Sequence, residues 1–320
     1  MNQPGVTLII PTYNGARRVE APLRALVEQT APSGCFDVVV VDNNSTDDTA
    51  RVVEQSASVA GLRRRGVEVR VVNEARQGLL FARLCGILSA RRDIICFLDD
   101  DNVPEPNFIV DGLAHFADAS VGAVVSRLYP RYETPPPPSI SRREHLLAIN
   151  HRMGDAVIDF GAGATIAPTI GAGLWLRRAA FLEAVPWQTP ERLMPDRLGN
   201  RLLSGGDIEL GFLLGKAGHR RIYSPALKVW HLIPPSRFET RYFLRLIVGV
   251  VRSEKTLEAR YLGRRMGAVS RMKNWARLVG AGLASPALAL RGDPVREVLF
   301  VLASRWAQAL GPYSHLHQSR

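Results

Sequence analysis

The chain has 320 residues, of which 46% are hydrophobic and 22% charged, so a full core is available and wholesale disorder is excluded. The net charge of +11 is concentrated at one end: residues 241–320 hold 14 Lys/Arg against 4 Asp/Glu, whereas residues 1–240 hold 27 against 26. Such a basic tail suits an anionic surface, either lipid or nucleic acid.

The N-terminal segment, the apolar runs and the cysteines indicate the cellular compartment in which the protein is expected. The chain has no basic start, its first apolar run breaks at Pro11, and no stretch approaches the roughly 20 apolar residues of a spanning helix. Cys35, Cys85 and Cys96 are odd in number and lack a metal-ligand spacing, which favours three buried thiols in a reducing compartment. We therefore expect a cytoplasmic protein.

The first third of the chain predicts alternating strands and helices. Continuous β-branched runs between helical segments favour an α/β fold, in which a parallel sheet is covered on both faces. The expected strands are Val6–Ile10, Val38–Val41, Val67–Val72 and Ile94–Leu98, and the expected helices are residues 16–30, Ser45 or Asp47 to about Val59, and Leu79–Ala90.

After Val125 the pattern loosens. Pro135–Pro138 predicts a stiff polyproline segment, and residues 186–206 predict a long loop because prolines and glycines lie among charges. The other expected elements are helices at 142–153, from Arg178 and at Asp207–Ala217, short strands at Ile222–Tyr223 and Val229–Trp230, and mostly amphipathic helix from Arg237.

Polar residues follow three of the predicted strands. They are Pro11-Thr12-Tyr13-Asn14, Asp42-Asn43-Asn44 and Asp99-Asp100-Asp101-Asn102. Open sheets of this kind bind ligands beyond the carboxyl ends of their strands. Consecutive carboxylates repel unless a cation sits among them, and Mg²⁺ or Mn²⁺ commonly bridges few carboxylates to phosphates. An acidic triplet alone is more often a solvated loop, but its place at a strand end favours a metal site.

Two other residues allow two interpretations each. Asp42 accepts bonds from a base or ribose, or it closes an Asx turn. Tyr13 stacks on a base, or it is an aromatic at the core edge. By themselves, Asp207 indicates a helix cap and His231 a satisfied histidine at the core edge.

Five ordered segments resemble the family 2 glycosyltransferases with the GT-A fold. They are LIIPTYN at 8–14, VVVDNNSTDDT at 39–49, Gly78 to Arg83, FLDDD at 97–101, and GDIEL to KAG at 206–218. The resemblance spans roughly residues 6–235. It implies a Rossmann-like, mostly parallel sheet flanked by helices, with a helical C-terminal extension. The catalytic domain would be 1–235, with a nucleotide-sugar half (1–125) and an acceptor half (126–235), followed by a basic helical extension at 236–320.

The resemblance also implies roles for single residues. Thr12 and Tyr13 would hold the base, Asp42 the edge of a uracil-type ring, Asp99 a sugar hydroxyl and Asp101 the Mn²⁺ or Mg²⁺. Asp207 would be the general base, and His231 would lie close to the diphosphate or metal. The remaining nucleotide-sugar contacts implied are Pro11, Asn14, Asn44, Gly78, Arg83 and Asp100.

This residue set is consistent with inverting transfer from a nucleotide-diphosphate sugar, with a UDP-sugar expected. The base takes a proton from the acceptor hydroxyl, the metal stabilises the leaving diphosphate, and no enzyme nucleophile is needed. The expected acceptor is a saccharide or a lipid-linked one, in polysaccharide or glycoconjugate biosynthesis. Gly206 departs from the family pattern, which has Glu before the base. Residues 237–245 lack the Gln-x-x-Arg-Trp signature of processive synthases, which favours single addition.

Two other functions, nucleotidyl transfer and anion binding without catalysis, are consistent with part of the sequence. A nucleotidyltransferase acting on sugar phosphates would usually open with a glycine-rich basic loop, whereas this chain has Pro11-Thr12-Tyr13-Asn14. A non-catalytic anion-binding protein would use its basic tail on nucleic acid, but Asp99–Asp101 would repel phosphates without a metal. Nucleic acid is therefore not an expected partner.

Two further regions are expected to border the acceptor or a membrane. Gly161–Gly173 and the 186–206 loop would line the acceptor pocket, since small residues permit close approach and long loops are often lids. The helix at 295–310 either docks on an anionic membrane, at the inner face of the cell membrane, or packs back on the catalytic domain. Its apolar face comprises Val295, Val298, Leu299, Leu302, Trp306 and Leu310.

Overall fold

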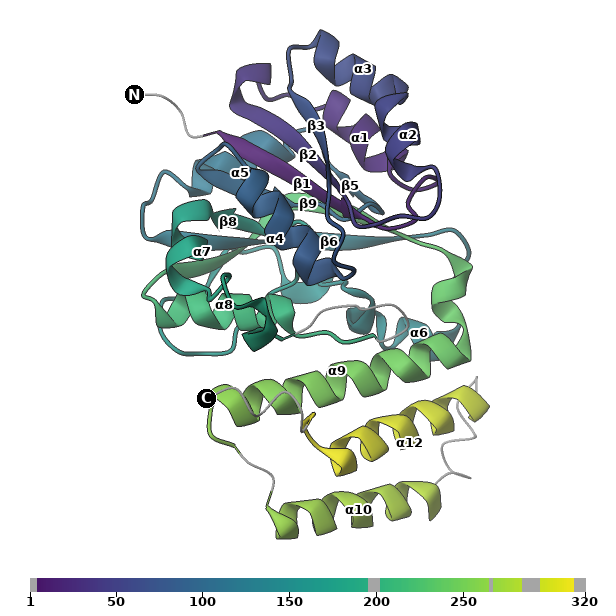
Figure 1. The fold of residues 1–320 in the computed structure, drawn as a ribbon. Helices are drawn as coiled ribbons and strands as arrows, with labels where there is room; N and C mark the ends of the chain where they lie inside the picture. The colour runs from purple at the N-terminus through teal and green to yellow at the C-terminus, as the bar shows by residue number, and fades with distance from the viewer. Residues whose placement is uncertain (1–4, 195–201, 265–266, 284–293, 314–320) are drawn as a thin grey trace. The chain divides into compact units, whose positions relative to one another are not determined.

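The computed structural model describes residues 5–194, 202–264, 267–283 and 294–313. The chain divides into two compact units (Figure 1). The sheet unit comprises Met1–Arg131, Ala148–Leu193 and Asp207–Leu232; the helical unit comprises Tyr132–Leu147, Met194–Gly206 and Ile233–Arg320. Two segments that precede the expected boundary at residue 235 thus group with the C-terminal helices.

One sheet runs through the described part of the chain, in the order β3-β2-β1-β4-β8-β6-β9-β5, with β7 paired to β9. The first four strands pair in parallel, β1 lying between β2 and β4. The later strands add antiparallel pairs, because β8 runs against both β4 and β6, and β9 against β5 and β7. The strands are β1 Val6–Thr12, β2 Phe36–Asp42, β3 Val69–Asn73, β4 Ile94–Phe97, β5 Asn102–Pro104, β6 Val121–Tyr132, β7 Ile158–Asp159, β8 Trp175–Arg177 and β9 Arg220–Ile233.

Helices cover both faces of the parallel part, which confirms the α/β prediction. Alternate residues of β1 enter two cores: Leu8 packs with Leu23 of α1 and Leu62 of α3, whereas Ile9 packs with Ile87 of α4. Figure 1 shows α4 crossing in front of the sheet. The helices of this unit are α1 Glu20–Val27, η1 Ser33–Cys35, α2 Thr49–Glu54, α3 Ala57–Arg64, α4 Leu79–Ser89, α5 Phe108–His115, η3 His151–Met153, α7 Arg178–Ala184, η4 Pro190–Arg192 and α8 Gly206–Lys216.

Three expectations about elements are wrong. The single helix expected to reach Val59 is two helices, because the Ser56 side chain accepts from Ser58 N and Val59 N and so caps a new one, α3. The two short strands after residue 220 are one strand, β9. Residues 142–153 form only short 3₁₀ turns, η2 and η3, instead of a helix.

The helical unit contains α6 Pro138–Ser141, η2 Glu144–Leu147, η5 Pro235–Phe238, α9 Thr240–Tyr261, α10 Ala268–Leu283 and α12 Pro294–Leu310. Glu297 of α12 is 5% exposed and accepts hydrogen bonds from Arg142 and Arg143, which ties α12 to the segment after α6. Phe300 of α12 packs on Phe243 of α9, with ring centroids 4.9 Å apart. None of the described helices is long and apolar enough to cross a membrane.

The cysteines are all free, yet only Cys96 is buried, while Cys35 and Cys85 are half-buried. Of the three thiols that were expected to be buried, only that of Cys96 is buried. Burial raises the pKa of the Cys96 and Cys85 thiols, which keeps both protonated and unreactive near neutral pH.

Candidate active site

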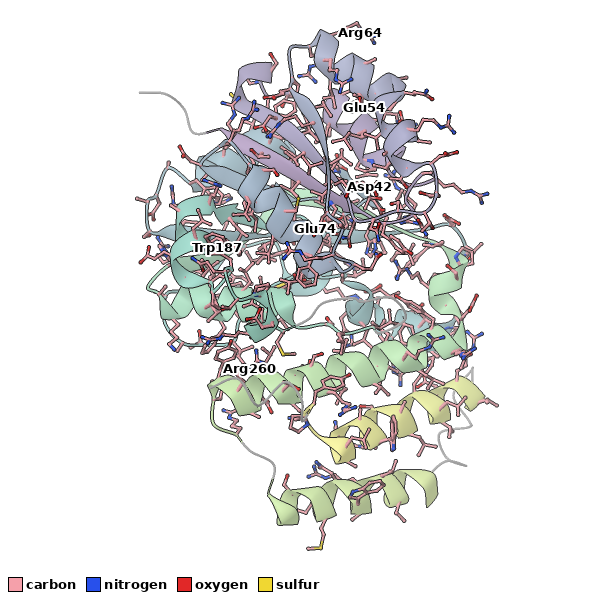
Figure 2. The ribbon with its side chains drawn as sticks, viewed as in Figure 1. Asp42, Glu54, Arg64, Glu74, Trp187 and Arg260 are labelled. Atoms are coloured by element: carbon pink, nitrogen blue, oxygen red, sulfur yellow. The ribbon has the colours of Figure 1, made fainter. Side chains whose placement is uncertain are left out.

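The parallel register brings the three polar segments to one edge of the sheet. Thr12 at the end of β1 is paired with Asp42 at the end of β2, and Asp99 follows β4 on the other side of β1. Figure 2 labels Asp42 at this edge, together with Glu74, which follows β3. The predicted convergence of strand ends is confirmed, because parallel neighbours end on the same side.

The first two segments are bound to each other. Asn14 Oδ1 accepts from Thr46 N at 2.8 Å, and Asn14 N donates to Ser45 Oγ at 3.0 Å. Asp42 Oδ1 accepts from Ser45 N, three residues further on, at 3.1 Å, which closes the turn after β2; an Asx turn would bond the residue two further on. Asn14 and Asn44 both have a left-handed backbone (φ +49° and +59°), which asparagine tolerates better than most residues.

Asn43 is a structural centre that the sequence did not single out. It is 3% exposed, and its Nδ2 donates to the carbonyls of Glu74 and Arg76 at 3.0 and 2.7 Å. Its Oδ1 accepts from Gly78 N at 2.8 Å, and Gly78 has φ +136°, which only glycine adopts readily. Gly78 therefore positions the start of α4, the helix that carries Arg83.

Asp100 joins the acidic triplet to the first segment. Its Oδ2 accepts from Thr12 Oγ1 at 2.7 Å, and Arg18 grips both of its oxygens, from Nε at 3.0 Å and Nη2 at 2.9 Å. Arg18 also donates to the Tyr13 and Asn14 carbonyls, so one side chain orders the whole turn. Burial raises the pKa of Asp100, and the bonds from Arg18 oppose that rise. Arg18 was not predicted.

Tyr13 is the exposed member of this group. Its side chain is 43% exposed, whereas Thr12 is 4% and Asp42 8% exposed. An exposed ring beside a buried carboxylate can stack on a planar ligand while the carboxylate bonds its edge. The Thr12 hydroxyl donates to Asp100, and its expected contact with the base stays a prediction.

Asp101 and His231 meet across β5 and β9. His231 Nε2 lies 3.4 Å from Asp101 Oδ2, and both residues are 9% exposed. Asn102, fully buried, donates to Asp101 Oδ1 at 3.1 Å, and Leu232 N donates to the Asp101 carbonyl at 2.9 Å. The Asn102 bond orients the Asp101 carboxylate, and the Leu232 bond fixes the Asp101 backbone, as is usual around metal ligands.

The Asp101–His231 pair fits a divalent cation. Mg²⁺ binds its ligands at about 2.0–2.1 Å in octahedral geometry, so two neighbouring ligand atoms lie about 3 Å apart. The 3.4 Å separation is close to that value. The described residues contain no cluster of three or more His, Cys, Asp or Glu side chains able to hold a metal. A cation here would take its other ligands from phosphate oxygens and water, as Mg²⁺ usually does.

Arg83 lies between the acidic triplet and Asp207. Its side chain is 7% exposed, Nη1 donates to Asp207 Oδ1, and Nη2 lies 3.6 Å from Asp99 Oδ1. The guanidinium also sits over the Phe97 ring, 5.0 Å from its centroid. Arg83 links Asp99 to Asp207, and its expected place near the nucleotide stays a prediction.

Asp207 begins helix α8 and is held from two sides. Besides the Arg83 bond, its Oδ2 accepts from Gly171 N at 2.8 Å. A Cβ atom on Gly171 would lie 2.2 Å from Arg83 Nη2 and 2.5 Å from Asp207 Oδ1, so a larger residue would displace these two side chains. Through Gly171, the Gly161–Gly173 segment therefore lies against Asp207 and helps to position its carboxylate. The 186–206 loop lies partly outside the described residues, since 195–201 are not among them.

A buried arginine supports the same segment. Arg221 of β9 is 1% exposed and donates to the Thr165 carbonyl at 2.7 Å, to Thr165 Oγ1 at 2.9 Å and to the Gly211 carbonyl at 3.1 Å. Gly211 belongs to α8, so Arg221 couples the segment to the helix that carries Asp207. Glu209, two residues after Asp207, is 1% exposed and thus lies on the buried face of α8.

Comparison with known proteins gives the family. The sequence profile of Glycosyl transferase family 2 matches residues 7–183, more than half of the chain. Glycosyltransferase AglE of Haloferax volcanii is 28% identical over 253 residues, which cover 72% of this chain and 81% of that protein. The putative glycosyltransferase EpsH of Bacillus subtilis is 28% identical over 108 residues, and the match spans only 29% of its length.

Solved structures share the fold. The mannosyltransferase PcManGT from Pyrobaculum calidifontis, in complex with GDP-Man and Mn²⁺, has a TM-score of 0.64 at 20% identity, covering 97% of this chain and 87% of that one. The S. aureus TarS fragment 1–349, in complex with UDP-GlcNAc, has a TM-score of 0.53 at 16% identity, covering 95% and 90%.

Proposed function

The chain belongs to glycosyl transferase family 2, and from that premise we propose that it transfers a sugar, with inversion and with a divalent metal, from a nucleoside-diphosphate sugar to an acceptor hydroxyl. The observation that carries this proposal is the gathering of Asp99, the Asp101–His231 pair and Asp207 at one edge of the sheet, with Arg83 between them.

On the donor side, each contact has a separate chemical task. The exposed Tyr13 ring stacks on the base, and Asp42 bonds its edge from beneath. Asp99, whose side chain is 31% exposed, reaches the ribose or sugar hydroxyls. Asn14, Asn44 and Gly78 shape this pocket through their backbone conformations. Asp100 acts indirectly, because Arg18 and Thr12 occupy its oxygens.

Asp101 and His231 would hold the cation, Mn²⁺ or Mg²⁺. When bound, the cation supplies Lewis-acid stabilisation of the charge that grows on the leaving diphosphate. Asn102 keeps Asp101 oriented for that purpose through its hydrogen bond. PcManGT was solved with Mn²⁺, which supports this choice by analogy of fold.

On the acceptor side, Asp207 removes the proton. The acceptor oxygen attacks the anomeric carbon, its O–H proton passes to an Asp207 carboxylate oxygen, and the bond from the anomeric carbon to the diphosphate oxygen breaks. One displacement inverts the configuration. A carboxylate has about four lone-pair sites, so Asp207 accepts from Arg83 and Gly171 and still bonds the acceptor hydroxyl. Gly171 and Arg83 act as positioning groups for it.

The substrates follow from the relatives by analogy. TarS was solved with UDP-GlcNAc and PcManGT with GDP-Man, so we propose a UDP-sugar first and a GDP-sugar second. The acceptor is a saccharide or a lipid-linked saccharide, in polysaccharide or glycoconjugate biosynthesis. We place the reaction in the cytoplasm, with nucleic acid having no part in it.

The test is product analysis with purified protein. UDP-GlcNAc, UDP-glucose and GDP-mannose are supplied with Mn²⁺, and release of nucleoside diphosphate is measured. Asp207→Asn is expected to lower turnover by about 10²- to 10⁴-fold, the usual contribution of a general base. Asp93→Asn is the matched control, because Asp93 is exposed and precedes β4 at the opposite end of the strand. Unchanged turnover in Asp207→Asn contradicts the base assignment. In a parallel reaction with UTP and a sugar 1-phosphate, release of pyrophosphate from UTP indicates nucleotidyl transfer instead.

A further inference from the structure

Helix α10 leaves one apolar face uncovered. Met272, Trp275 and Val279 follow at i, i+3 and i+7 and are 67%, 47% and 61% exposed. These positions lie on one side of a helix. The helix packs on α12 through a different side, where Asn274 Nδ2 donates to the Gln308 carbonyl at 3.1 Å. The stripe is therefore left free by the packing of the helical unit.

Helix α12 carries a second exposed stripe. Val295, Leu299 and Trp306 are 70%, 37% and 44% exposed, whereas Phe300 and Ala307 are buried. Of the apolar face that the sequence assigned to this helix, Val298, Leu302 and Leu310 are half-buried. The helix thus packs with one side within its unit and exposes the other. Contiguous exposed apolar surface on a folded protein usually marks an interaction site.

The charge around these stripes has one sign. Lys273 and Arg277 are exposed on α10, and α10 has no acidic residue. Residues 262–320 hold nine Lys/Arg against two Asp/Glu. One of the two acidic residues, Glu297, is buried in its ion pairs with Arg142 and Arg143. The surface therefore combines apolar side chains, tryptophan and uncompensated cations.

From these observations we propose that the α10 stripe Met272–Trp275–Val279, with Lys273 at its edge, docks on an anionic phospholipid surface. Apolar side chains enter the acyl boundary, the indole ring sits at the interface, and the cations meet the phosphate headgroups. Helix α10 has 16 residues and is about 24 Å long, which is shorter than a hydrocarbon core of about 30 Å. It lies on the membrane and does not cross it.

An anionic bilayer is a better partner for the stripe than a second copy of the chain or nucleic acid. A second copy of the chain would bring the same excess of Lys/Arg over residues 262–320 to the contact, and like charges would repel. Nucleic acid would satisfy the cations but would leave Met272, Trp275 and Val279 without an apolar partner. An anionic bilayer satisfies both kinds of side chain at once.

Vesicle co-sedimentation of the full chain tests the proposal without any measurement of activity, so its outcome is independent of the proposed reaction. Phosphatidylcholine vesicles containing about 30% phosphatidylglycerol are compared with phosphatidylcholine alone. We expect binding to the anionic vesicles that weakens with salt and is abolished by Trp275→Glu combined with Val279→Glu. Leu88→Glu is the matched control, since Leu88 is 48% exposed on α4 and should leave binding unchanged.

A second variant separates charge from folding. Lys273→Gln removes one surface charge at the edge of the stripe and should weaken binding to anionic vesicles about fivefold. Thermal transitions of all variants should match wild type, because the altered side chains are exposed. Three results overturn the proposal: no binding to anionic vesicles, equal binding to both vesicle types, or a concentration-dependent dimer in solution that Trp275→Glu dissociates.

Discussion

Replacing Gly171 by alanine tests the arrangement around Asp207 with a single methyl group. The added Cβ would lie 2.2 Å from Arg83 Nη2 and 2.5 and 2.6 Å from the two Asp207 oxygens, all far inside van der Waals contact. The substitution removes no charge and no hydrogen-bonding group, and Gly171 has no left-handed backbone to strain. Any effect therefore comes from displacing Arg83 and Asp207 from each other.

The magnitude follows from the bond that is lost. A hydrogen bond to a charged group contributes about 1.5–3 kcal/mol. Each 1.36 kcal/mol corresponds to a factor of ten in rate, so loss of the Arg83–Asp207 bond in the transition state predicts a fall in turnover of about 10- to 150-fold. Arg83→Met should cause a fall of similar size. With Arg83→Met already present, Gly171→Ala should cost less than it does alone, because the two changes break one bond.

The assay is release of nucleoside diphosphate from the preferred donor, measured with saturating Mn²⁺. Gly34→Ala is the matched control, because a Cβ on Gly34 meets nothing within 4 Å and its turnover should equal that of wild type. Thermal unfolding shows whether the variant stays folded. Turnover of Gly171→Ala within twofold of wild type, or costs that simply add in the double variant, would refute the reasoning.

Three other predictions concern the metal, the acidic triplet and the helical unit. Asp101→Asn should weaken Mn²⁺ binding more than about tenfold by calorimetry, and retained affinity contradicts the ligand assignment. Arg18→Gln should raise the donor KM, because Asp100 and the Tyr13 carbonyl lose their donor; an unchanged KM removes Arg18 from the site. Burial alone would raise the pKa of Glu297, but hydrogen bonds from Arg143 and Arg142 bring it below the ordinary 4.5. The bonds from Arg143 and Arg142 should therefore stabilise the fold above about pH 4.5, and this stabilisation should be lost as pH falls through the lowered pKa of Glu297. Glu297→Gln should cost about 2 kcal/mol at pH 7, and equal stability at pH 7 and at low pH would contradict this.

The parallel part of the fold could be read from the sequence because its signals are local. Continuous apolar runs such as Val38–Val41 are buried strands wherever they lie, and the polar residues after them must end at a common edge. The split between α2 and α3 could also have been found, since Ser56 is a standard helix cap. The full length of β9 could not, because its pairing partners β5 and β7 come from distant segments.

The candidate site likewise contains residues that the sequence predicted and residues that it did not. The carboxylates Asp42, Asp99 and Asp101 were singled out because each ends or follows a strand, and Asp207 was singled out because its segment resembles that of the family. Their positioning groups were missed. Arg18 lies 82 residues from Asp100 in sequence, and Gly171 lies 36 residues from Asp207. Such contacts depend on tertiary packing, and an arginine on a helix gives no local sign of its partner.

The central claim is that a nucleoside diphosphate binds at the acidic strand ends through a cation held by Asp101. Calorimetric titration of UDP and GDP, with Mn²⁺ or with a chelator, tests it most directly. We predict binding of at least one nucleotide that requires Mn²⁺, is lost in Asp101→Asn and persists in Asp207→Asn, because Asp207 serves the acceptor. Binding that is independent of Mn²⁺ and of Asp101, or no binding of either nucleotide, would contradict the account.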